Sequence, residues 1–324
     1  MYNERKAFYK DYEEMQSTRI ISYITGNRPG METQIASDAF PFFVEHLDRI
    51  GVVDKISLYL YTEGGSVAEA CSIINFVRLF CENLEVIVPS KCRSAGTLMC
   101  LGADAIVMTK QATLGPIDPT CNGLLNPLVP GAPNPYTRVP VSVEAINGYI
   151  NIAKEELKIC DNAAMADILI SLSDKIHPLT LGDTYRARKQ IRMLAEKLLR
   201  LQGSKDADIP KIVDFLCCDS GSHDYSINRR EAKALGLNVR IPTVEEYNII
   251  KSIYEDFSEE MEFKSPFNQL PSQPGGYEAK RVFVETLDAS AVFFTKIDCI
   301  SGMPSGNPGD GPVFSSIDGW RDNS

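Results

Sequence analysis

The chain has 324 residues, of which 44% are hydrophobic and 23% charged, a composition that can bury a large core in one or two domains. Its net charge of −10 disfavours nucleic acid and anionic lipid as partners. No segment approaches the roughly 18 consecutive apolar residues of a membrane span, and the charged N-terminus lacks the apolar stretch of a signal peptide. We therefore expect a soluble, cytoplasmic protein without a membrane span.

The nine cysteines are scattered, mostly within apolar runs, and no two of them form a C-x-x-C pair. That distribution is typical neither of a zinc site nor of a disulfide framework. The chain also lacks the glycine-rich motifs of dinucleotide and ATP sites. We therefore expect reduced thiols, no metal and no other cofactor.

Strands and helices are predicted to alternate over the first third of the chain. A polar segment at 1–16, helical or frayed, comes first, and β-branched runs and helical spacing of apolar residues follow. Strands are expected at 19–25, 55–62, 84–89 and 105–108, and helices at 32–50, 66–80 and 94–102. This alternation favours an α/β domain with a mainly parallel sheet and right-handed crossovers.

The remainder of the chain changes character after a Pro/Gly/Asn-rich loop at 123–140. Residues 141–216 are predicted to be mostly helical, with the longest helix at 178–202. A further helix is expected at 243–262, with Thr243 as its N-cap. After it come, in order, a linker at 264–276, a hairpin formed by 281–287 and 291–297, and a Gly/Pro-rich tail at 301–313.

Two turns between a strand and a helix carry the residues of chemical interest. Gly64 and Gly65 allow a sharp turn whose backbone N–H groups can face an anion. Ser94, thirty residues after Gly64, begins the next predicted helix. Taken alone, the glycine pair is also compatible with a tight strand-to-helix turn, and Ser94 is also compatible with an N-cap serine. Together they lie at the carboxyl ends of strands of one sheet, the edge where α/β proteins place their sites.

Both turns belong to a longer pattern that resembles the Clp protease proteolytic subunit, signal peptide peptidase A and, most of all, the serine dehydrogenase proteinase family. The pattern consists of the runs TEGGSVAEACSIINFVR and VIVPSKCRSAGTLMCLGADAIVMTKQATLGPIDP. The resemblance covers about residues 18–245 and implies the Clp/crotonase superfold, a ββα superhelix. It further implies that Ser94 is the nucleophile and that the N–H groups of Gly65 and Ala95 form the oxyanion hole.

This resemblance suggests three parts of the chain. An N-terminal polar segment (1–17) precedes a Clp/crotonase-like catalytic domain with a helical arm (18–245), and a C-terminal extension contains a helix, a linker and a β-hairpin (246–324). Members of the superfold commonly assemble through their helical arms. Because the helices within 141–216 carry more apolar residues than one face needs, we expect a homo-oligomer.

The general base is less clearly indicated. At the place where the Clp subunit has its catalytic histidine, this chain has Gly115 to Pro119 and no histidine. The aspartate of the family aligns with Asp224, and the adjacent His223 is our first choice as the base. Asp118 is the alternative acid that could orient it. A serine needs such a partner because its hydroxyl is a poor nucleophile near pH 7.

A serine–lysine dyad, as in signal peptide peptidases, is the rival arrangement, since a desolvated lysine can act as a base. The available lysines are Lys91, Lys154, Lys158 and Lys189. Of the two other histidines, His46 is expected to pack in a helix and His177 to lie at a helix start.

The preferred function is a serine peptidase that cleaves peptide bonds by acyl transfer and acts on peptide or protein substrates. One alternative is a catalytically inactive oligomeric scaffold or binding protein of the same fold. Another is an acyl-thioester enzyme of the crotonase type, although no adenine-binding feature is visible. The chain has no motif for ATP-driven unfolding, and the sequence does not indicate an unfoldase partner.

Overall fold

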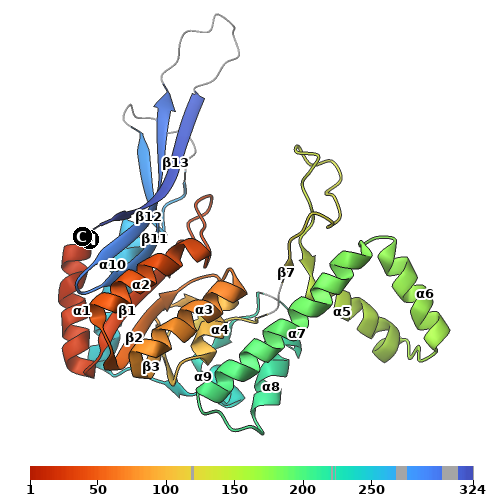
Figure 1. Ribbon diagram of the computed structural model, residues 1–324, viewed down its shortest axis with the longest axis horizontal. Helices are drawn as coiled ribbons and strands as arrows, with labels where there is room; N and C mark the ends of the chain where they lie inside the picture. Colours follow the sequence, from red (N-terminus) through yellow and green to blue (C-terminus); the bar gives the residue numbers. More distant parts are fainter. Residues whose placement is uncertain (118–119, 220–221, 223, 268–275, 301–312, 324) are drawn as a thin grey trace, which may run out of the picture. The chain divides into compact units, whose positions relative to one another are not determined.

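The computed structural model describes all residues except 118–119, 220–221, 223, 268–275, 301–312 and 324 (Figure 1). The chain forms two compact units. The first comprises residues 1–114, 201–204 and 226–324, and the second comprises residues 115–200 and 205–225. Within the described residues, no helix is both long enough and apolar enough to cross a lipid bilayer.

An eight-stranded sheet forms the centre of the first unit, in the order β10-β5-β3-β2-β1-β11-β12-β13. The five strands from β10 to β1 are parallel, and the three that follow are antiparallel to their neighbours. The predicted α/β class with a mainly parallel sheet is therefore confirmed. The strands are β1 Arg19–Thr25, β2 Val53–Tyr61, β3 Cys81–Val88, β5 Ala105–Met108, β10 Val239–Arg240, β11 Tyr277–Thr286, β12 Ser290–Ile300 and β13 Val313–Asp322.

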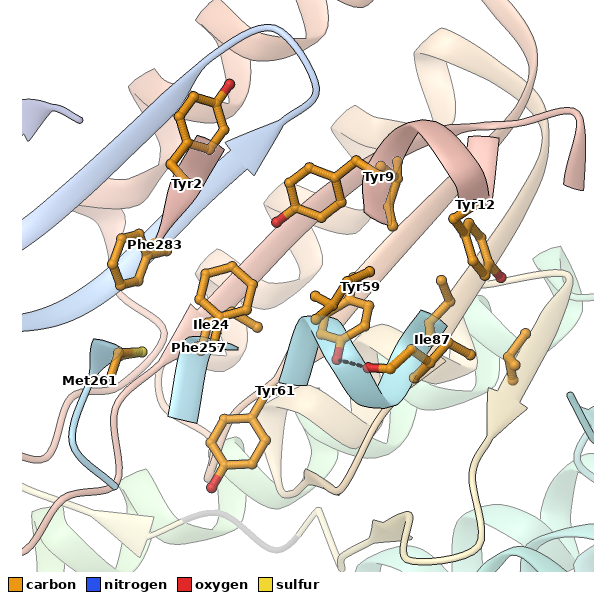
Figure 2. Close-up of a cluster of buried hydrophobic side chains, with 14 of the residues drawn as sticks. Tyr2, Tyr9, Tyr12, Ile24, Tyr59, Tyr61, Ile87, Phe257, Met261 and Phe283 are labelled. Atoms are coloured by element: carbon orange, nitrogen blue, oxygen red, sulfur yellow. Dashed lines mark hydrogen bonds between the residues drawn. The ribbon is translucent and has the colours of Figure 1, made fainter. Parts of the chain in front are cut away.

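Helices cover both faces of this sheet, so its central strands are continuous apolar runs. On one face, Tyr23 packs edge-on against Phe43 of α2, with ring centroids 5.2 Å apart. On the other face, α1 and α10 enclose a tyrosine-rich core in which Tyr59 donates a hydrogen bond to the carbonyl of Ile250 at 2.8 Å (Figure 2). The helices of this unit are α1 Tyr2–Gln16, α2 Phe40–Ile50, α3 Val67–Val77, α4 Ala95–Leu101, α9 Arg229–Leu235 and α10 Val244–Glu260, with short 3₁₀ turns at Ser37–Ala39 and Arg78–Phe80.

The helix expected from residue 32 begins only at Phe40, because Pro41 suits the first turn of a helix and not its interior. The 3₁₀ turn at Ser37–Ala39 directly precedes it, and before that turn Ile35 forms a parallel bridge with Gly65. By contrast, Thr243 caps α10 as predicted and forms a capping box with Glu246.

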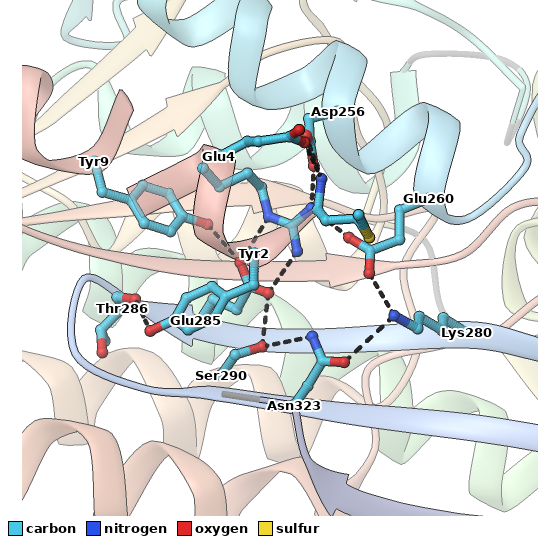
Figure 3. Close-up of polar contacts among 12 residues, drawn as sticks. Tyr2, Glu4, Tyr9, Asp256, Glu260, Lys280, Glu285, Thr286, Ser290 and Asn323 are labelled. Carbon is cyan, nitrogen blue, oxygen red and sulfur yellow. Dashed lines mark hydrogen bonds and ion pairs between the residues drawn. The ribbon is translucent and has the colours of Figure 1, made fainter. Parts of the chain in front are cut away.

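The predicted C-terminal hairpin is confirmed as β11 and β12, but a third strand, β13, was not predicted. Trp320 on this strand stacks on Phe42, with ring centroids 4.4 Å apart, and its indole N–H donates to Asp38 at 2.8 Å. The extension is also held by a buried ion cluster, in which Arg5 of α1 pairs with Glu285 of β11 at 2.6 Å (Figure 3).

Arg5 also contacts two carboxylates of α10, Asp256 and Glu260. Burial of the guanidinium is tolerated because three carboxylates and the ring of Phe257, 4.1 Å from Cζ, surround it.

The second unit is mainly helical, as predicted for residues 141–216. The loop expected at 123–140 is irregular apart from a bridge between Leu128 and Arg138. None of the residues of α6 is buried, although most of them are apolar. The elements are β7 Thr120–Cys121, β8 Val141–Ser142, α5 Val143–Asn151, α6 Asn162–Ser173, α7 Pro178–Leu201 and α8 Ile209–Asp214, with π turns at Ile152–Glu156 and Phe215–Asp219.

Candidate active site

The two turns predicted from the sequence start side by side at the carboxyl ends of β2 and β3. Beyond these strands, Thr62 and Cys92 form a parallel bridge. The N–H of Thr62 donates to the carbonyl of Lys91 at 3.1 Å, and the N–H of Arg93 donates to the carbonyl of Thr62 at 3.0 Å. This pairing sets the register of the two segments, so Gly64 and Ser94 each follow two residues after a member of the bridge.

Gly64 and Gly65 are required by contact as well as by conformation, since their φ angles are 120° and 142°. A Cβ at Gly64 would lie 2.8 Å from the Cβ of Ser94. A Cβ at Gly65 would lie 2.4 Å from the backbone nitrogen of Ile35. The first glycine therefore brings its backbone against the serine, and the second brings it against the segment before α2.

Ser94 occupies the position before α4 with φ 50° and ψ −118°, a conformation that non-glycine residues rarely adopt. Such strain costs about 1 to 3 kcal/mol and is concentrated at functional sites. The side chain does not cap the helix that follows. The hydroxyl is 3.3 Å from where a Gly64 Cβ would stand, so it faces the glycine turn and not the core.

Two backbone N–H groups, those of Gly65 and Ala95, come directly after the contact between Gly64 and Ser94. The bridge between Ile35 and Gly65 uses the carbonyl of Gly64 and the N–H of Ser66, each at 2.8 Å, so the N–H of Gly65 points to the opposite side. Ala95 is the first residue of α4, where an N–H has no partner within the helix. Among the described residues, neither amide donates a hydrogen bond.

Two further residues support the turns, and one of them, Thr62, was not singled out in the sequence. Thr62 accepts a hydrogen bond from Thr25 at 2.8 Å and another from the N–H of Gly64 at 3.0 Å, so it holds the glycine turn in place. Gly96 is also required, because its Cβ would lie 2.4 Å from Thr62 and 2.9 Å from the sulfur of Cys92. The signal for Thr62 was its place at the end of a buried strand, directly before the glycine motif.

Charged side chains lie next to both turns. Glu63 accepts a hydrogen bond from Lys91 at 2.8 Å and lies 3.5 Å from the guanidinium of Arg93. Arg93 in turn donates to the hydroxyl of Ser226 at 3.0 Å. Lys91, one of the lysines considered as a base, is thus bound to a carboxylate. The other three, in the second unit, are exposed at Lys154, Lys158 and Lys189.

The predicted base and the alternative acid, His223 and Asp118, lie outside the described residues. Asp224 is exposed, and its N–H donates to Ser222 at 3.2 Å. His46 is buried in α2, where desolvation lowers its pKa to about 4. His177 accepts a hydrogen bond from the N–H of Leu179 at the start of α7.

Comparisons with known proteins agree with the resemblance seen in the sequence. Residues 49–129 match the profile of a family described as ClpP-like SDH-type serine proteinases. Two uncharacterized proteins of Methanocaldococcus jannaschii are also similar. One is 28% identical over 64% of this chain and 61% of its own length, and the other is 24% identical over 78% and 75%. The chain thus spans less than two thirds of the first of these relatives.

Among solved structures, two mutants of the 1510-N membrane-bound stomatin-specific protease are similar. The first has 15% identity and a TM-score of 0.40 and covers 71% of this chain and 80% of its own. The second, a complex with a substrate peptide, has 13% identity and a TM-score of 0.38 and covers 74% and 96%. The matched segment 49–129 contains both turns described above, so in the part of the chain that carries Ser94 this protein is similar to ClpP-like serine proteinases of the SDH type.

Proposed function

We propose that this protein is a serine peptidase that cleaves peptide bonds by acyl transfer, with Ser94 as the nucleophile. Its similarity to a serine proteinase family supports a peptidase at the family level. The observation that carries the assignment of Ser94 is its strained backbone, with a hydroxyl that does not cap the helix and faces the Gly64 turn. Structural serines at helix starts normally cap the helix with that hydroxyl.

In the proposed reaction, the Ser94 hydroxyl attacks the peptide carbonyl and loses its proton to a general base. The N–H groups of Gly65 and Ala95 donate to the oxyanion that forms, and losing one such donor typically costs ~3 kcal/mol of transition-state stabilisation. The leaving amine takes up the proton, and water then hydrolyses the acyl-enzyme.

We retain His223 as the proposed base, with Asp224 or Asp118 as the orienting acid. A contact near Ser94 supports this choice: Ser226, two residues after Asp224 in the chain, accepts a hydrogen bond from Arg93, the residue before Ser94. The lysine alternative is weaker for Lys91, since its amine already has Glu63 as a partner at 2.8 Å. The rival lysines of the second unit are exposed and not desolvated.

Labelling with a fluorophosphonate probe tests the nucleophile. We expect one adduct, located on Ser94 by peptide mass spectrometry, and no adduct in the Ser94→Ala variant. Ser66→Ala is the matched control, because Ser66 caps α3 with its side chain and should label no differently from the original protein. An unlabelled Ser94 in the folded protein would favour the inactive scaffold, and turnover of an acyl-CoA would favour the crotonase-type enzyme.

We also propose that the protein self-associates. Large apolar side chains are exposed along the helices of the second unit, and apolar surface of this kind is usually an interface. They include Leu169, Ile170, Leu179, Tyr185 and Met193. Light scattering at micromolar concentration should give a mass that is a multiple of 35.9 kDa, and the monomer mass alone would contradict the proposal.

A further inference from the structure

A short row of charged residues lies directly before the nucleophile and the proposed oxyanion donor. In an extended segment, side chains alternate between two faces. Cys92 points into the core, where its sulfur meets Gly96. Lys91 and Arg93, on either side of it, therefore share the opposite face. Thr62 is paired with Cys92, so the next residue, Glu63, reaches the same row from the neighbouring strand.

This row contains two cations and one anion, so it has a net positive charge in a protein whose total is −10. One carboxylate, that of Glu63, pairs with both cations. Among the described residues, Arg93 has one further partner, the hydroxyl of Ser226, which is neutral. The positive charge of the row is therefore only partly compensated.

The row is also held in position before any substrate arrives. Arg93 is 23% exposed; its guanidinium donates a hydrogen bond to the hydroxyl of Ser226 at 3.0 Å, and its Nε lies at ion-pair distance, 3.5 Å, from a carboxylate oxygen of Glu63. A planar guanidinium held in this way loses little freedom when it binds a carboxylate. Lys91, 39% exposed, has its ammonium 2.8 Å from an oxygen of the same carboxylate. Both cations are accessible, and partial burial reduces their screening by water.

We propose that Arg93 and Lys91 form a recognition site for a carboxylate on the peptide substrate, within a few residues of the bond that Ser94 attacks. The inference rests on the proposed peptidase function and specifies its substrate class. Arg93 adjoins Ser94 in the chain, and a strand advances about 3.3 Å per residue. The side chains of the row can thus reach a substrate Asp or Glu near the scissile bond, but not a distant one.

In this arrangement, Glu63 should weaken the binding of a substrate carboxylate, whereas Arg93 and Lys91 should strengthen it. It orients both cations, but it also repels an incoming carboxylate. Removing its charge should therefore strengthen the preference for acidic peptides, whereas removing either cation should weaken it. A purely structural role of the three residues predicts no such change of sign, because each substitution would then only loosen the turns.

Binding to the Ser94→Ala protein tests the proposal without requiring catalysis. The probes are N-acetylated, C-amidated alanine-based octapeptides with a single Glu at each of the six central positions in turn, each paired with the same peptide carrying Gln. Calorimetry gives the ratio of the two Kd values for each pair. We expect the Glu peptide to bind about five- to tenfold more tightly at one or two adjacent positions, as for a charge-assisted hydrogen bond in a half-exposed site.

Further substitutions in the Ser94→Ala protein then identify the residues that cause the difference between the two Kd values. Arg93→Gln and Lys91→Gln should bring the ratio towards one, Glu63→Gln should raise it, and Arg49→Gln, which removes a half-exposed charge in α2, should leave it unchanged. Raising the salt concentration from about 0.05 to about 0.5 M should also reduce the ratio. Melting curves establish that each variant is folded.

A ratio of one at all positions, or no measurable binding of any pair, would overturn the proposal. So would a ratio that Arg93→Gln and Lys91→Gln do not change. Fluorophosphonate labelling of the original protein separates this outcome from failure of the peptidase assignment. Labelled Ser94 without a carboxylate preference leaves the peptidase standing, and a carboxylate preference without labelling supports the recognition site but not the peptidase.

Discussion

The glycines around Ser94 in the first unit differ from the helical glycines of the second unit in the space around them. At Gly64, Gly65 and Gly96 of the first unit, an added Cβ would lie within 3 Å of another residue. At Gly148 and Gly182 of the second unit, nothing lies within 4 Å of an added Cβ. Close contacts thus specify the turns around Ser94 almost atom by atom, whereas the helices of the second unit leave space around their backbone. We expect the catalytic chemistry at the turns around Ser94, where the close contacts allow no residue larger than glycine at these three positions.

His223→Ala should have the largest effect, because a general base takes part directly in the proposed acyl transfer. If His223 is the base, kcat/KM should fall by about 10³-fold or more. In the original protein, kcat/KM should rise with pH through an apparent pKa of about 6.5 to 7, the histidine range. Steady-state kinetics across pH measures both. Near-normal turnover of the variant would show that another group is the base.

Gly65→Ala tests the glycine position with one of the shortest contacts, 2.4 Å from an added Cβ to the backbone nitrogen of Ile35. The new methyl group would meet the backbone of Ile35, and a backbone at φ 142° is strained for alanine. We expect the free energy of unfolding to fall by about 2 to 4 kcal/mol and Ser94 labelling to be lost. Urea denaturation and probe labelling measure the two effects. A variant with unchanged stability would mean that this turn tolerates more than its contacts indicate.

His46 gives the first unit a specific sensitivity to acid. Burial lowers the pKa of its imidazole to about 4 in the folded protein, against about 6.5 in the unfolded chain. As the pH falls below 6.5, the unfolded chain takes up a proton that the folded protein cannot, so stability is lost down to about pH 4. Over this range the protein should lose about 2 to 3 kcal/mol more than His46→Gln.

Chemical denaturation at several pH values measures this difference. Paired carboxylates such as Glu85 and Glu260, whose pKa values are lowered, also destabilise the protein as they are protonated in acid. Their contribution is the same in both proteins and cancels in the comparison. Parallel stability curves for the two proteins would refute the role of His46.

Gly182→Ala should have the smallest effect and the opposite sign. Gly182 lies within α7, and alanine there meets no other atom. A glycine in a helix interior is less stable than alanine by about 0.5 to 1 kcal/mol, so the variant should be more stable by that amount. Thermal unfolding measures the gain, with Gly148→Ala in α5 as a second example. A loss of stability would indicate that the second unit is packed more tightly than its open glycines suggest.

Much of the fold could be predicted because it depends on local patterns. The strands at 55–62 and 84–89 are buried apolar runs, and the N-cap at Thr243 is a neighbouring-residue signal. β13 was missed because residues 313–322 contain serine, glycine and charges without clear alternation. Such a segment becomes a strand only when a neighbour, here β12, offers its edge.

By itself, the sequence determined the order of strand, glycine turn and helix and the position of Ser94 at the second turn, since glycine freedom and helix starts are local properties of the chain. Only the tertiary structure decided which distant segments meet there. It placed Ile35 beside Gly65 and paired Thr62 with Cys92. These contacts join residues about thirty positions apart, and their geometry depends on how the strands align in the sheet, which no local pattern specifies.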